Sequence, residues 1–352
     1  MKLKSIFLLI LLSITTITFA EKKQKNIFAP FSNPGEYIIH EVRDAYQWEI
    51  CKIGDKEISI PLPVIVYSKA RKHWYIFWST KIADGKKYKG FFLKPDSPHK
   101  WRLVEDVNGK IVRPLDLSIT KDVVALWITA IILLWIFLSI AKRYKKDPYA
   151  PPKGFQALLE PLVLFIRDDV AKANIGEKYY MRYTPFLLTV FFFILLNNLM
   201  GLLPFFPGGA NTTGNLAVTG VMAFFTFVIT TLSGKKHYWK EIFWNPVAPW
   251  WMKFPIPLMQ TIELVGVIEK PTVLAIRLFA NILGGHVVRV TFISLIFIFA
   301  AFGVAVALGI SVVSVFFAVF STVLELLVAF IQAYVFTILS ALYFGMAVEE
   351  EE

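Results

Sequence analysis

The sequence is short of charged residues and almost devoid of cysteine. Charged residues make up 18% of the 352-residue chain, hydrophobic residues make up 56%, and Cys51 is the only cysteine. A single cysteine excludes an intramolecular disulfide framework and a thiolate metal site. The scarcity of charge and the apolar excess place the chain among membrane proteins rather than soluble globular ones.

The sequence also lacks a glycine-rich phosphate-binding loop, so we expect no ATP chemistry in this chain. We likewise expect no catalytic residue, no cofactor and no metal site. The formal net charge is +11, but the basic residues cluster beside apolar runs rather than along a polar face interleaved with aromatics. This arrangement favours orientation in a membrane over binding to nucleic acid.

Residues 1–20 have the pattern of a signal peptide. Lys2 and Lys4 precede a short apolar core, and Thr18-Phe19-Ala20 forms a small-residue cleavage pattern. The mature chain would then begin near Glu21. An uncleaved membrane helix is the alternative, and both interpretations place the segment that follows outside the cytoplasm.

Residues 21–122 have the composition of a small β-rich extracytoplasmic domain. Apolar runs at 63–67 and 74–78 predict strands, and Asn108-Gly109 between β-forming residues predicts a hairpin. The aromatic residues of this domain favour a place in its core or at a membrane interface over a binding site.

Residues 123–352 form the predicted membrane domain. Length and apolarity predict spans at about 123–141, 183–203 and 215–232. Between the first two, residues 154–172 carry apolar side chains at helical spacing opposite a polar side. This segment is expected to be an amphipathic helix on the inner membrane surface.

Basic residues predict how the chain is oriented. Residues 142–146 form a basic cluster after the first span, and Lys235, Lys236 and Lys240 follow the third. Because cytoplasmic loops carry an excess of Lys and Arg, both groups belong on the cytoplasmic side. We expect a multi-pass protein of the cell inner or plasma membrane, with an extracytoplasmic N-terminus and a cytoplasmic C-terminus. The acidic residues 349–352 are expected to form a solvated tail.

The last two apolar segments are too long for upright spans. They cover about 257–302 and 304–347 and are separated by a glycine-containing turn. Each would be about 65 Å long as a helix, roughly twice the hydrocarbon thickness of a bilayer. We therefore expect a strongly tilted antiparallel pair, which completes an all-α polytopic fold with five membrane-embedded helices.

Ionisable and amide side chains lie inside these long segments. Placing the Arg277 guanidinium at membrane depth costs from about 2.5 to well over 10 kcal/mol, so such a residue is expected to face a water-lined path or a partner charge. Glu263 and Asn281 fall within about 40° of Arg277 around a helix and share its face. His286 points to the opposite side.

The second long segment adds Glu325 and Gln332, which are seven residues apart and share a face. A histidine has an unperturbed pKa of about 6.5, so it accepts and releases protons at cellular pH. A carboxylate that faces it can share the proton. An arginine remains a permanent cation. The set predicts a proton path in which Arg277 is the gate and His286 and Glu325 are carriers.

These residues resemble a known family, the a subunit of F-type ATP synthases. The resemblance covers roughly the last two thirds of the chain. It rests on Lys270-Pro271, Arg277-Leu278-Phe279-Ala280-Asn281, Glu325 with Gln332, Asn197-Asn198-Leu199-Met200-Gly201-Leu202-Leu203-Pro204 and Asn211-Thr212-Thr213-Gly214-Asn215. It implies a non-catalytic stator subunit that packs against a rotating ring of c subunits, assembles with the b subunits of the peripheral stalk, and forms two offset aqueous half-channels for protons.

The resemblance also implies roles for particular residues. Arg277 would face the ring carboxylate as an electrostatic gate that blocks direct proton leak between the half-channels. Glu263 matches the acidic position on the cytoplasmic exit side. Asn281 and Gln332 are expected to line the channel.

His286 and Glu325 match the outer-side pair of the family, but many members carry the acid first and the histidine second. If the two positions face each other, exchanging acid and base preserves one shared proton site. We therefore expect the two side chains to approach within hydrogen-bonding reach, directly or through one water.

Two other classes of protein compete with this interpretation. A self-contained secondary transporter or channel for protons or cations would be favoured by internal inverted repeats, which we do not find. A structural membrane anchor would use its polar residues only for helix packing, the role that we favour for Asn197 and Asn198.

Overall fold

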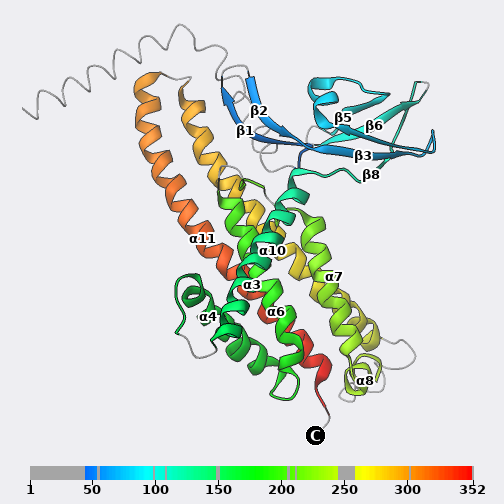
Figure 1. Ribbon diagram of the computed structural model, residues 1–352, viewed down its shortest axis with the longest axis vertical. Coiled ribbons are helices and arrows are strands. Elements are labelled where there is room, and N and C mark those ends of the chain that lie inside the picture. Colours follow the sequence, from blue (N-terminus) through cyan, green and yellow to red (C-terminus); the bar gives the residue numbers. More distant parts are fainter. Residues whose placement is uncertain are drawn as a thin grey trace, which may run out of the picture.

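A computed structural model of the chain combines small β-sheets with a bundle of long helices (Figure 1). The structure describes residues 44–53, 56–97, 100–107, 109–147, 151–203, 207–210, 212–244, 258–300 and 303–350. The predicted signal peptide at 1–20 lies outside these residues.

The strands of the N-terminal region form antiparallel sheets with the orders β1-β2, β4-β3-β8 and β5-β6-β7. The predicted strands at 63–67 and 74–78 are confirmed as β3 and β4. The predicted hairpin is confirmed between β6 and β7, where Val107 pairs with Lys110 and Gly109 has a φ of 82°. The bounds are β1 (Gln47–Ile53), β2 (Lys56–Pro61), β3 (Pro63–Ser68), β4 (His73–Trp78), β5 (Phe91–Ser97), β6 (Lys100–Val107), β7 (Lys110–Val112) and β8 (Leu115–Asp116).

The two three-stranded sheets pack face to face over one apolar core. Burial alternates along β3, so that every second side chain enters this core. Its buried members are Val64, Val66, Phe77, Ile82, Phe91 and Leu103. The opposite face of the β4-β3-β8 sheet is left outside the core.

Among the described residues, five helices are long and apolar enough to cross a membrane. Their bounds lie within about five residues of the segments that the sequence predicts as spans. Their bounds are α3 (Lys121–Lys146), α6 (Tyr180–Leu202), α7 (Leu216–Ser233), α10 (Leu258–Ala300) and α11 (Val304–Val348).

The helices α10 and α11 form an antiparallel hairpin and lie side by side (Figure 1). Gly303 occupies the turn with a φ of 121°, a conformation that glycine adopts without strain. The second helix of the hairpin, α11, also packs against α6, and α10 packs against α7. Their shared core includes Leu187, Phe191, Leu278, Phe336 and Phe344.

The segment predicted to be an amphipathic helix is helical, but it is not one regular α-helix. The segment divides into α4 (Phe155–Phe165), a π-helix η5 (Ile166–Lys172) and α5 (Ala173–Ile175). Gln156, predicted on the polar side, is buried, whereas Phe155 is exposed. The π-helix changes the angular spacing after Ile166, so residues of η5 and α5 enter the main helical core.

Glu350, in the acidic C-terminal stretch predicted to be solvated, is exposed but also makes specific contacts. Lys178 and Lys235 form ion pairs with Glu350, and the Tyr179 hydroxyl donates a hydrogen bond to it over 2.7 Å. The Lys235 hydrogen bond, followed by those from Tyr179 and Lys178, lowers the pKa of Glu350 from 4.5 to about 2. A short helix that the sequence did not predict, α8 (Lys236–Trp244), packs beside this end of α11.

The β-sheet region is attached directly to the helical bundle. Trp48 of β1 is buried with Ala125 of α3 and with Ala210, in the connection that precedes α7. The Lys121 amide at the start of α3 donates to the Ala45 carbonyl over 2.9 Å. These contacts fix the sheets at the end of the bundle where α3 begins.

Candidate functional site

The two asparagines near the end of α6 bond to neighbouring segments of the bundle. Asn197 Oδ1 accepts hydrogen bonds from Thr129 of α3 over 3.2 Å and from Thr212 over 2.9 Å, and its Nδ2 donates to the Phe193 carbonyl over 2.8 Å. These bonds join two spans and the connection that follows α6.

Asn198 makes the corresponding contacts on the other side of α6. Its Oδ1 accepts from the Thr213 hydroxyl over 2.7 Å, and its Nδ2 donates to the Ala329 carbonyl of α11 over 3.2 Å. Both asparagines are buried. The interpretation of Asn197 and Asn198 as packing groups is confirmed.

Arg277 has a different environment on α10. Its neighbours Leu274 and Leu278 are buried in the helical core, whereas the Arg277 side chain is exposed. Within the part of the chain that the structure describes, Arg277 makes no hydrogen bond or ion pair. It lies close enough to Tyr343 of α11 for an electrostatic interaction.

The other predicted channel residues lie at different levels of the hairpin. Asn281 is exposed one turn after Arg277, on the same side of α10. Glu263 is half-buried near the start of α10, and Gln332 is buried on α11. The structure does not bring Glu263, Asn281 and Gln332 into one hydrogen-bonded cluster with Arg277 among the described residues.

Glu325 of α11 forms an ion pair that crosses the hairpin to α10. Its Oε2 lies 3.0 Å from Nη1 of Arg289, and the two side chains are 8% and 15% exposed. The pair is therefore largely shielded by the two helices, which makes it stronger than an exposed one.

The Glu325 side chain also lies against the backbone of α10 at Gly285. A Cβ at that position would lie 2.8 Å from Glu325 Oε1, so only glycine leaves room for the carboxylate in this position. Glu325 Oε2 is buried and makes no hydrogen bond of normal geometry to any described group. This oxygen can still accept a proton or a hydrogen bond.

His286 follows Gly285 directly, but its side chain lies outside the described residues. The expected approach of His286 to Glu325 therefore stays a prediction. The partner that sequence reasoning missed is Arg289. It was a second guanidinium in the same long apolar segment, and the cost of burying it already indicated a partner charge.

The described residues contain no group of three or more His, Cys, Asp or Glu side chains placed to hold a metal ion. Among the ionisable groups of the long helices, Arg277 is an exposed cation, and Arg289 and Glu325 form a shielded ion pair. The fold and these groups define a class, a multi-pass membrane protein with charged side chains inside its spans.

Comparison with known proteins identifies the family. The family described as ATP synthase A chain matches residues 123–345. A protein described as ATP synthase subunit a from Chlorobium phaeobacteroides is 45% identical over 256 residues, which cover 69% of this chain and 71% of that protein. Another with this description, from Myxococcus xanthus, is 45% identical over 251 residues, covering 69% of this chain and 77% of its own length.

The chain belongs to the ATP synthase A chain family, and its role is that of subunit a of the F-type ATP synthase. It is a multi-pass membrane subunit that takes part in proton transport and works in a complex with other FO subunits. The β-sheet region lies outside this match. Residues 37–117 match a family described only as a domain of unknown function (DUF8433).

Proposed function

We propose that the chain forms two proton half-channels against a rotating ring of c subunits and couples proton flow to rotation, without catalysing a reaction itself. The observation that carries this proposal is Arg277, a guanidinium that is exposed and unpaired within the described part of a membrane-spanning helix. A charge at membrane depth requires a partner, and the described residues do not supply one.

The surface around Arg277 has the character of a helix-packing face. Exposed residues follow one another at intervals of three or four along α10, and they are apolar or small apart from Arg277 and Asn281. This set is Val273, Ile276, Arg277, Ala280, Asn281, Gly284 and Val288. Small residues allow close approach of a second helix in a membrane, so a ring helix can bring its carboxylate to the guanidinium.

The chemistry of arginine gives Arg277 the role of an electrostatic gate. A guanidinium stays protonated at cellular pH and cannot carry protons along a relay. It favours the ionised form of a carboxylate that arrives beside it, which makes that carboxylate release its proton. Its fixed charge also opposes direct movement of protons from one half-channel to the other.

On the outer side, Glu325 is the proton carrier that the geometry supports best. Arg289 and the open backbone at Gly285 hold its carboxylate between α10 and α11. We assign His286, which is adjacent in sequence, as the second member of this relay. Arg289 is a positioning residue in this scheme, because a guanidinium does not exchange protons.

On the inner side, we assign Glu263 to the cytoplasmic exit, with Asn281 and Gln332 lining the path. The proposed orientation has the β-sheet domain at 21–122 outside and the C-terminus in the cytoplasm, with the signal peptide at 1–20 removed. It is supported by the basic residues in the last turn of α3, Arg143, Lys145 and Lys146.

The remaining parts of the proposal concern the assembly. The length of α10 and α11 supports strong tilting of both helices in the bilayer. The b subunits of the peripheral stalk are the further partners in this proposal. The surface helix at 154–172 and the membrane domain from 123 onward would then form the static part that the ring turns against.

The direct test is Arg277→Ala in the assembled complex. We expect ATP-driven proton pumping into inverted membrane vesicles to be abolished while the complex still assembles, because no fixed cation remains to discharge the ring carboxylate. Arg182→Ala, an exposed arginine at the start of α6, is the matched control and should leave pumping unchanged. Unimpaired pumping by Arg277→Ala would defeat the mechanism.

A further inference from the structure

The outward face of the β4-β3-β8 sheet is apolar across all three strands. The strand pairing places its residues in three rows that run across the sheet. These rows are Trp74, Tyr67 and Leu115; then Ile76, Ile65 and Leu117; then Trp78, Pro63 and Ile119. No row contains a charged residue.

This face is not covered by any described part of the chain. Ile76, in the middle row on the edge strand β4, is 73% exposed, and Trp74, Trp78, Leu115 and Leu117 are also exposed. The inner face of the same sheet already supplies the core of the β-sheet region. A continuous exposed apolar face of this kind marks a surface that binds something in the working protein.

The position of the face in the chain indicates what covers it. The last row ends at Ile119, and α3 begins at Lys121, so the sheet is tied within two residues to the point where the first span starts. In Figure 1, β3 and β8 lie on the side of the sheets nearest the helices.

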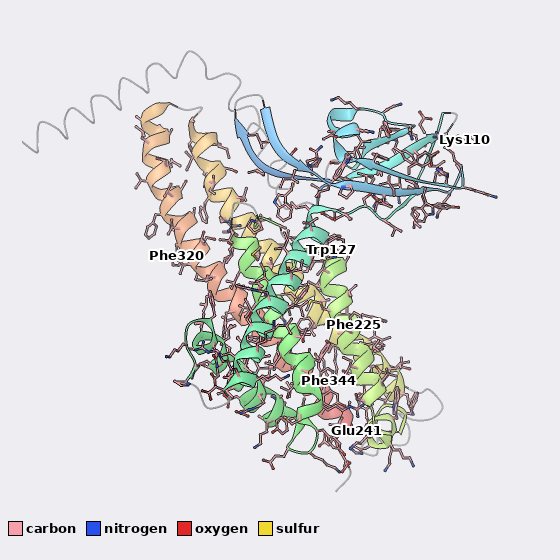
Figure 2. The ribbon with its side chains drawn as sticks, in the orientation of Figure 1. Lys110, Trp127, Phe225, Glu241, Phe320 and Phe344 are labelled. Carbon is pink, nitrogen blue, oxygen red and sulfur yellow. The ribbon has the colours of Figure 1, made fainter. Side chains whose placement is uncertain are left out.

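The apolar surface continues from the sheet onto the span itself. The α3 side chains Trp127 and Ile131 are exposed, and Figure 2 shows Trp127 on α3 below the sheets. Because the outer surface of a membrane span faces lipid, the sheet face adjoins a surface that lipid already covers.

We propose that the outward face of β4-β3-β8 rests in the interfacial layer of the bilayer at the membrane surface where α3 begins. Trp74 and Trp78 lie at headgroup level, the depth that tryptophan prefers, and Ile76 and Leu117 reach toward the acyl chains. The β-sheet region is then a platform that binds the membrane surface rather than a freely projecting domain.

Spin labelling of the full chain in its ATP synthase complex, reconstituted in liposomes, tests this placement. Cys51→Ser removes the native thiol, and Ile76→Cys or Trp78→Cys then carries a nitroxide on the proposed face. Lys110→Cys is the control, because this exposed position lies in β7, on the sheet that packs behind the proposed face (Figure 2).

Power saturation reports collisions of each label with oxygen, which concentrates in lipid, and with a water-soluble nickel chelate. We expect the labels at 76 and 78 to collide several-fold more with oxygen than with the chelate, and the label at 110 to show the reverse. Ready access of the chelate to position 76 would overturn the proposal. Protection from both reagents would also overturn it, in favour of a protein partner.

Discussion

Polar side chains of the membrane domain lie in two different kinds of environment. On α6, the amides of Asn197 and Asn198 are buried and use both of their polar atoms in hydrogen bonds to neighbouring segments. On the α10–α11 hairpin, Arg277 makes no ion pair to a described residue, and the buried Oε2 of Glu325 has an ion pair with Arg289 but no hydrogen bond to the described groups.

This difference distinguishes residues that hold the helices together from residues that we propose to act in proton transport. A polar group with all its partners stabilises one arrangement of helices, and removing it costs stability. A polar group that lacks partners in a low-dielectric environment is costly, so it is expected where function requires it. We therefore expect changes on α10 and α11 to impair transport, and changes on α6 to impair stability.

Of the substitutions compared below, Glu325→Gln should reduce proton pumping the most. Glutamine has nearly the same shape but cannot bind and release a proton, so ATP-driven pumping should fall about tenfold or more. The amount of assembled complex should stay the same. Pumping at the level of the unmodified protein would show that Glu325 serves helix packing, as Asn197 and Asn198 do, and would contradict the distinction between the two groups.

Gly285→Ala should reduce pumping several-fold by displacing Glu325. The added methyl group would lie 2.8 Å from Glu325 Oε1, so the carboxylate must leave its position beside Arg289. Gly309→Ala on α11 is the matched control, because a Cβ there meets no atom within 4 Å. Equal pumping by the two variants would show that the position of the carboxylate does not matter.

Asn198→Ala should lower stability and leave transport intact. It removes the partner of the Thr213 hydroxyl and of the Ala329 carbonyl, and such bonds between membrane helices contribute about 0.6 to 1.7 kcal/mol. The measurements are resistance of the complex to denaturant and pumping per assembled complex. A loss of pumping without a loss of stability would assign Asn198 to the site instead.

Glu350→Gln should have the smallest effect, because this carboxylate is exposed and its ion pairs are weakened by solvent and salt. The pKa of Glu350 is lowered from 4.5 to about 2, chiefly by Lys235. Its stabilisation of the C-terminus is therefore present above about pH 4.5 and is lost as pH falls toward about 2. Hydrogen exchange of the C-terminal amides, corrected for intrinsic pH dependence, should show this loss only when Glu350 is present.

The sequence predicts the elements of the membrane domain well because apolar length and helix geometry are local properties. The spans follow from them, as do the positions of Arg277 and Glu325 inside the long helices. Which charges meet across two helices depends on their relative rotation, so the pairing of Arg289 with Glu325 could not be predicted. The sequence also does not indicate the π-helix at Ile166–Lys172, which changes the side of the segment that is buried.

The family resemblance explains why a candidate site could be predicted from the sequence alone. The spacing of Arg277, Asn281, Glu325 and Gln332 is a pattern along the chain. The β-sheet region has no comparable pattern of chemical groups. Its apolar outward face emerges only when the register of β3, β4 and β8 brings Ile65, Ile76 and Leu117 together.

The gating role that we propose for Arg277 is tested most directly by proton flux with rotation blocked. The rotor is cross-linked to the stator in vesicles that carry the full complex, and proton flux down an imposed gradient is measured. With Arg277 in place, the blocked complex should pass no protons. The Arg277→Ala complex should leak them, because nothing then separates the two half-channels. Equally tight vesicles for both proteins would contradict the gate.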